Sequence, residues 1–151
     1  MTVIKPGTAV RFPNRDLTQH HVYSFSKPKV FEIELYGGDE PNPIRFDNTG
    51  IVALGCNIHD WMLGYVYVTP DAHFGTTDER GRLTLSVEPS AIAAVTLWHP
   101  GMKNAEPVVF NSGDLPSAPG GVYELAVEIP AGDPLAFDPD PLQALFEDQT
   151  R

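Results

Sequence analysis

Residues 55–62 read Gly55-Cys56-Asn57-Ile58-His59-Asp60-Trp61-Met62, and this stretch anchors the interpretation of the whole chain. It holds the only cysteine, one of five histidines and one of three methionines. A thiolate, an imidazole and a thioether together suit a copper ion better than other common metals. The spacing therefore predicts a copper site in which Cys56, His59 and Met62 are ligands.

The residues around this stretch predict that it is a loop between two strands. Ile51 to Leu54 is an apolar run that leads directly into Cys56, and Gly64 to Val68 follows Met62 with the composition of a strand. A fourth ligand must come from a neighbouring strand, and the pair His20-His21 is the obvious source. Because strand side chains alternate, only one of the two can point inward. We expect His20 to ligate, with His21 as the alternative.

The rest of the chain predicts an all-β protein. Its 15 prolines and 13 glycines stand between short apolar runs, as is typical of β-proteins. Phe31 to Leu35 and Tyr123 to Ile129 alternate apolar and acidic residues, the signature of half-buried strands. Further strands are expected at Val3-Ile4, Ala9–Phe12, His20–Phe25, Ile44–Phe46 and Leu83–Val87, the last after a turn at Asp78–Gly81.

Several segments carry a resemblance to the cupredoxins, the type 1 blue copper proteins. Thr2 to Asn14 looks like the strand pair that precedes the first ligand of that family, and His20-His21-Val22 resembles its His-Asn-Val segment. Thr49 to Cys56 resembles the strand that runs into the ligand cysteine. The ligand loop is similar in spacing to that of amicyanin. The longer segments 20–26 and 55–65 look like those of bacterial plastocyanin-like proteins that are called methylamine utilisation proteins. The resemblance covers residues 2–69.

This resemblance implies a Greek-key β-sandwich and a copper ion held by His20, Cys56, His59 and Met62. Two positions depart from the family pattern. His21 stands where an asparagine usually braces the ligand loop, so it either takes over that supporting role or is itself the ligand. Gly55 stands where an aromatic residue often precedes the cysteine.

The domain organisation expected from the sequence has three parts. Residues 1–69 form the copper-binding module, residues 70–130 form a β extension packed on it, and residues 131–151 form an acidic Pro/Asp-rich tail with one candidate helical turn at Leu142–Phe146. The charge divides in a similar way. Residues 1–69 carry 6 bases and 7 acids, whereas residues 70–151 carry 4 bases and 13 acids.

The function expected from these features is single-electron transfer between redox partners, without turnover of a substrate. The formal charge of −10 disfavours nucleic acid and anionic membranes, and no apolar run approaches the roughly 18 residues of a membrane span. A redox protein such as a c-type cytochrome or a dehydrogenase is the expected partner, and Trp61 and Leu63 are candidates for its docking patch. We expect a periplasmic location, although no signal segment opens the chain.

Other interpretations of the same residues remain open. A more open copper site would suit a carrier or sensor that delivers metal, and a metal-free β-sandwich would be an interaction module. A Cys-His hydrolase lacks an evident orienting carboxylate beyond Asp60. A structural zinc site is also possible, but a thioether is a poor zinc ligand.

Overall fold

The computed structural model describes residues 1–15, 17–59, 62–116 and 122–129 of the chain. Asp60, the candidate docking residue Trp61 and the predicted tail at 131–151 with its helical turn lie outside these residues. The chain divides into two compact units, Met1–Ser86 and Val87–Arg151. The three-part organisation expected from the sequence stays a prediction.

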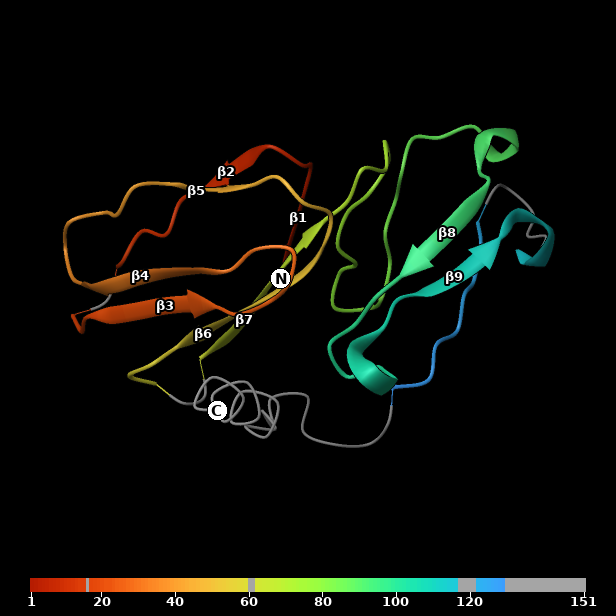
Figure 1. Ribbon diagram of the computed structural model, residues 1–151. Coiled ribbons are helices and arrows are strands. Elements are labelled where there is room, and N and C mark those ends of the chain that lie inside the picture. The colour runs from red at the N-terminus through yellow and green to blue at the C-terminus, as the bar shows by residue number, and fades with distance from the viewer. Residues whose placement is uncertain (16, 60–61, 117–121, 130–151) are drawn as a thin grey trace, which may run out of the picture. The chain divides into compact units, whose positions relative to one another are not determined.

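The first unit is built on a five-stranded sheet with the order β1-β7-β6-β3-β4 (Figure 1). Strands β6 and β7 are joined by the segment that contains His59 and Met62, and the pairs β7/β6, β6/β3 and β3/β4 are antiparallel. Strand β1 pairs with β7 in parallel. The strands are β1 (Thr2–Ile4), β3 (His20–Ser24), β4 (Phe31–Tyr36), β6 (Gly50–Cys56) and β7 (Leu63–Val68).

A second sheet covers one face of the first and closes the core. It pairs β2 (Thr8–Val10) with β5 (Ile44–Phe46) in antiparallel fashion. Phe46 of β5 packs with Val52 of β6 and Val68 of β7, and all three are completely buried. The five-stranded sheet therefore has an inner face toward this core and an outer face away from it. On β6 the inner face carries Val52, Leu54 and Cys56, because strand side chains alternate.

The turn Lys5 to Thr8 sends β1 and β2 into different sheets. Gly7 has a φ of 85°, which favours glycine, and the Thr8 amide donates to the Lys5 carbonyl at 3.2 Å. The predicted strands on both sides of this turn are thus present, but neither pairs with the other. Each finds its partner far along the chain, in β7 and in β5.

Strand β4 contains a bulge that the alternating sequence does not show. Its register with β3 shifts between the pairs His20/Tyr36 and Val22/Ile33, which leaves one extra residue on β4. Ile33 is buried as predicted, whereas Leu35 is exposed and the prediction that it lies inward is wrong. The bulge turns Tyr36, instead of Leu35, toward the position opposite His20.

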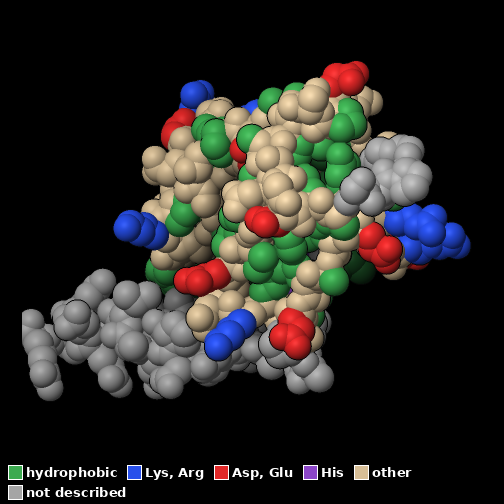
Figure 2. Space-filling view, turned by 90° about the vertical axis from the view of Figure 1, so that its right-hand side faces the viewer, with side chains coloured by type: hydrophobic (Ala, Val, Ile, Leu, Met, Phe, Trp, Pro, Cys, Tyr) green, Lys and Arg blue, Asp and Glu red, His purple; other side chains and the backbone are tan. Residues whose placement is uncertain are grey.

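The second unit has less regular structure. It pairs β8 (Ala94–Leu97) with β9 (Val108–Asn111) and contains three short 3-10 helices, η1 (Pro89–Ala91), η2 (Lys103–Ala105) and η3 (Ser112–Asp114). Among the described residues of this unit, Met102 is the buried apolar one, while Val109 and Val122 are exposed. Figure 2 shows hydrophobic side chains in several places between isolated acidic and basic groups.

Two predicted strands are not formed. The turn at Asp78–Gly81 is present, with the Gly81 amide donating to the Asp78 carbonyl, but Leu83 to Val87 after it has no strand partner among the described residues. The segment Tyr123 to Ile129 is likewise unpaired there. Alternation of apolar and polar residues indicates which side chains would face the core in an extended segment. It does not show that another strand is available to pair with that segment.

The prediction of an all-β fold is confirmed, because the described residues contain strands and 3-10 turns and no α-helix. Among these residues no helix has the length and apolar character needed to cross a membrane.

Candidate metal centre

The candidate site lies where the start of one strand meets the end of its neighbour. His20 is the first residue of β3 and Cys56 the last residue of β6. Since these strands are antiparallel, with Val22 opposite Cys56, both residues lie at the same end of the sheet. His20 and Cys56 also share the inner face, because each has the parity of Val22 in this register.

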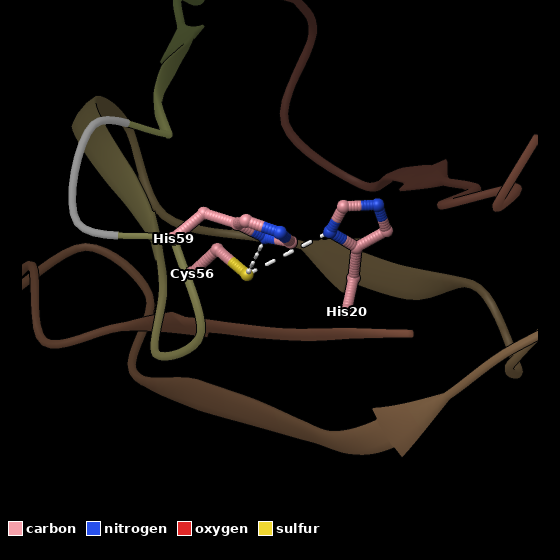
Figure 3. Close-up of side chains that lie close together, drawn as sticks. All are labelled: His20, Cys56 and His59. Atoms are coloured by element: carbon pink, nitrogen blue, oxygen red, sulfur yellow. Dashed lines mark hydrogen bonds between the residues drawn. The ribbon is translucent and has the colours of Figure 1, made fainter. Parts of the chain in front are cut away.

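His59 joins them from the loop that follows β6. The Met62 amide donates to the His59 carbonyl at 2.9 Å. His59 Nδ1 lies 3.6 Å from Cys56 Sγ, and His20 Nδ1 lies 3.7 Å from the same sulfur. Figure 3 shows both imidazoles directed at the sulfur from different elements. We call His20, Cys56 and His59 the His-Cys-His cluster.

The cluster has a geometry that is compatible with a metal site. Its three ligand atoms lie within 4.8 Å of one another, and His20 and Cys56 are buried while His59 is half-buried. With a metal–sulfur bond of about 2.3 Å, a metal–nitrogen bond of about 2.0 Å and a tetrahedral or trigonal angle between them, sulfur and nitrogen on one ion are roughly 3.5–3.7 Å apart. The two observed sulfur–nitrogen distances fall in that range, so the cluster could hold a metal ion.

The electrostatics of the cluster favour a thiolate. Burial raises the pKa of the Cys56 thiol, but four hydrogen bonds outweigh it and lower the pKa from 9.0 to about 6. They come from the backbone of His21 and Ile58 and from the side chains of His20 and His59. Because the thiolate is the form that binds metals, the sulfur is prepared for a metal at neutral pH.

The Tyr36 phenol stays protonated near the Cys56 thiolate. Tyr36 is the register partner of His20. Burial raises the pKa of the Tyr36 phenol, and the negative charges of Cys56 and Glu40 raise it further.

Asn14 connects the segment before His20 to the end of β4. Its Nδ2 donates to the carbonyls of Thr18 and Tyr36 at 2.8 and 3.3 Å.

His21 lies on the outer face, away from the cluster. Its Nε2 is 2.6 Å from Glu32 Oε1 of β4, and its Nδ1 is 3.5 Å from Asn57 Nδ2. Of the two adjacent histidines, His20 is therefore the one that lies with Cys56 and His59. The sequence did not single out Glu32 or Asn57, because their role depends on the register of three strands.

Met62 follows the cluster on the loop, with 40% of its surface exposed. Ile58, on the same loop, is 49% exposed. The spacing that predicts Met62 as a ligand is present in the sequence, and its participation stays a prediction.

Gly55 is accommodated by an aromatic ring from the neighbouring strand. Tyr23 is its register partner on β3, and a Cβ added to Gly55 would lie 2.8 Å from Tyr23 Cζ. The ring therefore occupies the space directly beside the residue that precedes Cys56. A larger residue at position 55 would require the far end of the Tyr23 side chain to shift.

The chain was compared with protein-family models and with curated proteins, and neither comparison produced a match.

Proposed function

We propose that this chain is a type 1 copper protein that carries single electrons between redox partners. The observation that carries the proposal is the His-Cys-His cluster, in which a thiol of lowered pKa and two imidazoles lie at ligand spacing at one end of a β-sheet. Copper held by these residues would supply one-electron chemistry between Cu(I) and Cu(II), for which this donor set is suited. The chain would act as a carrier of electrons and not as an enzyme.

The scaffold supports this proposal through its sheet order. A five-stranded sheet with a parallel β1/β7 pair, covered by β2 and β5, is compatible with a Greek-key sandwich of cupredoxin type. In such a fold His20 comes from a sheet strand and Cys56, His59 and Met62 from one loop region. Ligands held by hydrogen-bonded strands move little when the charge of the ion changes, which favours fast electron transfer.

The expected partner would approach at the ligand loop. Ile58 and Met62 are exposed there and His59 is half-buried, so that an electron could leave through the imidazole edge of His59. A redox protein of basic charge, such as a c-type cytochrome, or a dehydrogenase suits the net charge of −10. A periplasmic location belongs to the same proposal.

A copper carrier or sensor is the second candidate. The exposure of Met62 favours it, because a site open on the thioether side could exchange its metal with another protein. A metal-free interaction module is the third, and it predicts that no metal binds at all.

One titration separates the three functions. Addition of Cu(II) to the metal-free protein should produce an intense visible thiolate-to-copper band, a narrow copper hyperfine splitting and a stoichiometry of one ion per chain. Cys56→Ser should abolish the band, while His73→Ala and His99→Ala, at two histidines outside the His-Cys-His cluster, should leave it intact. Absence of the band in wild type would exclude the electron-transfer function. Ready loss of bound copper to a modest chelator would favour the carrier.

A further inference from the structure

Three side chains form a hydrogen-bonded row on the outer face of the sheet, directly behind the His-Cys-His cluster. We call Glu32, His21 and Asn57 the outer-face triad. Glu32 lies on β4, His21 on β3, and Asn57 immediately after β6. In register, Asn57 continues the β3/β6 pairing to stand opposite His21, and Glu32 stands opposite Tyr23, one diagonal step from His21.

The donors and acceptors of the outer-face triad form one consistent chain. The Glu32 carboxylate can only accept, so His21 Nε2 donates to Oε1 over 2.6 Å. In the neutral imidazole this leaves Nδ1 as an acceptor, and the Asn57 side-chain amide can donate to it over 3.5 Å. Glu32 therefore selects the tautomer of His21 that is able to receive Asn57.

The outer-face triad is connected to the cluster through the backbone. His21 follows His20, and Asn57 follows Cys56, so each outer residue is covalently adjacent to an inner one. The Asn57 amide also donates to the His21 carbonyl at 3.1 Å. Beside the β3/β6 pairing and the hydrogen bonds that Cys56 itself receives, Asn57 thus adds two hydrogen bonds between the chain segments that carry His20 and Cys56, one through side chains and one through the backbone.

We propose that the outer-face triad is a positioning device that fixes the spacing of His20 and Cys56 before any metal arrives. This rests on the proposed function as far as copper is concerned. Glu32 lies on the face of the sheet opposite to the cluster, and its side chain is 63% exposed. Any effect of Glu32 on the cluster must pass through His21 and Asn57.

The exposed position of Glu32 permits a sharp test. Glu32→Ala removes the acceptor, and Glu32→Gln retains an acceptor oxygen without the charge. Glu34→Ala is the matched control, because Glu34 is an exposed glutamate two residues further along the same strand. Asn57→Ala breaks the other end of the row. An exposed ion pair contributes little stability, so all four variants are expected to fold.

The first readout uses metal-free protein. Cys56 is only 6% exposed, so its alkylation by iodoacetamide at a fixed pH reports how often the β3 start and the loop separate. Glu32→Ala and Asn57→Ala should react about fivefold faster than wild type, the factor that one typical hydrogen bond represents. Glu34→Ala should match wild type, and Glu32→Gln should recover most of the difference.

The second readout is copper itself. Glu32→Ala should lower Cu(II) affinity about tenfold, the lower end of the effect of supporting residues at metal sites, and should shift the thiolate-to-copper band. If alkylation responds as described but wild type binds no copper, the proposed function fails while the positioning role stands. If Glu32→Ala and Asn57→Ala behave as Glu34→Ala does in both readouts, the positioning role is refuted.

Discussion

Tyr23 occupies the space that a side chain on Gly55 would need: a Cβ at position 55 would come within 2.8 Å of Cζ and 2.9 Å of the hydroxyl oxygen of Tyr23. The ring covers the backbone beside Cys56 from the outer face, and it packs on Phe25 with ring centroids 5.2 Å apart. A glycine on β6 and a tyrosine on β3 thus form one packing unit next to the candidate metal centre.

Gly55→Ala should destabilise the protein by about 1 kcal/mol, because the far end of the half-buried Tyr23 side chain must shift. The measurement is urea unfolding. Gly64→Ala is the matched control, since a Cβ there would meet Leu54 at an ordinary 3.7 Å. In the Tyr23→Ala background, Gly55→Ala should lose most of its effect. Equal costs for Gly55→Ala in both backgrounds would show that the two residues are not coupled.

Phe46→Ala should destabilise the first unit by about 3–5 kcal/mol. Phe46 is completely buried, packs with Val52 and Val68, and meets Phe31 edge to face with ring centroids 5.9 Å apart. Since these contacts join the two sheets, their loss should also weaken copper binding. Val30→Ala is the control, because Val30 is 63% exposed. Similar unfolding midpoints for the two variants would contradict the assigned core.

The strands of the first unit could be predicted closely because their residues alternate or run apolar between turns. Ile44 to Phe46 and Gly64 to Val68 were expected almost at their observed ends. The cluster could be predicted in part, since Cys56 and His59 share one short loop. The sequence favours His20 over His21 as the ligand, and the pairing of Val22 with Cys56 is what places His20 on the inner face.

Features that depend on register were not predictable from one sequence. The bulge that exposes Leu35 adds one residue to β4 within a regular apolar–polar alternation, and the amino-acid sequence does not indicate where it occurs. The neighbours Glu32 and Asn57 become partners of His21 only once three strands are aligned. Leu83 to Val87 shows the converse, because its alternation is real but no strand among the described residues pairs with it.

The Cys56 thiol should titrate in metal-free protein with a midpoint near its pKa of about 6, well below the ordinary 9.0. Alkylation rates should therefore rise through about pH 6 and level off near neutrality. A buried cysteine without the four hydrogen bonds would instead react only at alkaline pH. A midpoint at or above 8.5 would contradict the stabilised thiolate.

The same shift makes the stability of the metal-free protein depend on pH. Between about pH 6 and pH 9 the unfolded thiol holds a proton that the folded thiol has lost, so the unfolded state binds more protons. The free energy of unfolding should rise with pH across this window, and the contribution should disappear as the pH falls through about 6. Cys56→Ser should remove this part of the rise, which urea titrations at two pH values would measure.

Met62→Leu tests whether the thioether is a ligand. Leucine keeps the volume and removes the sulfur, so a site that uses Met62 as a weak ligand should still bind copper through the His-Cys-His cluster. Loss of one donor favours Cu(I), which tolerates fewer ligands. Each tenfold shift of relative affinity toward Cu(I) raises the reduction potential by about 59 mV, so we expect a rise of roughly 60 mV or more.

The oxygen donor in Met62→Gln should have the opposite effect, because a harder ligand favours Cu(II) and lowers the potential. Met102→Leu is the control, since Met102 is a buried methionine of the second unit. Voltammetry and the visible spectrum measure both variants. If Met62→Leu and Met62→Gln keep the wild-type potential while copper stays bound, then Met62 is not a ligand. The copper site would in that case be formed by the three residues of the His-Cys-His cluster, which are the ligands that the geometry brings together.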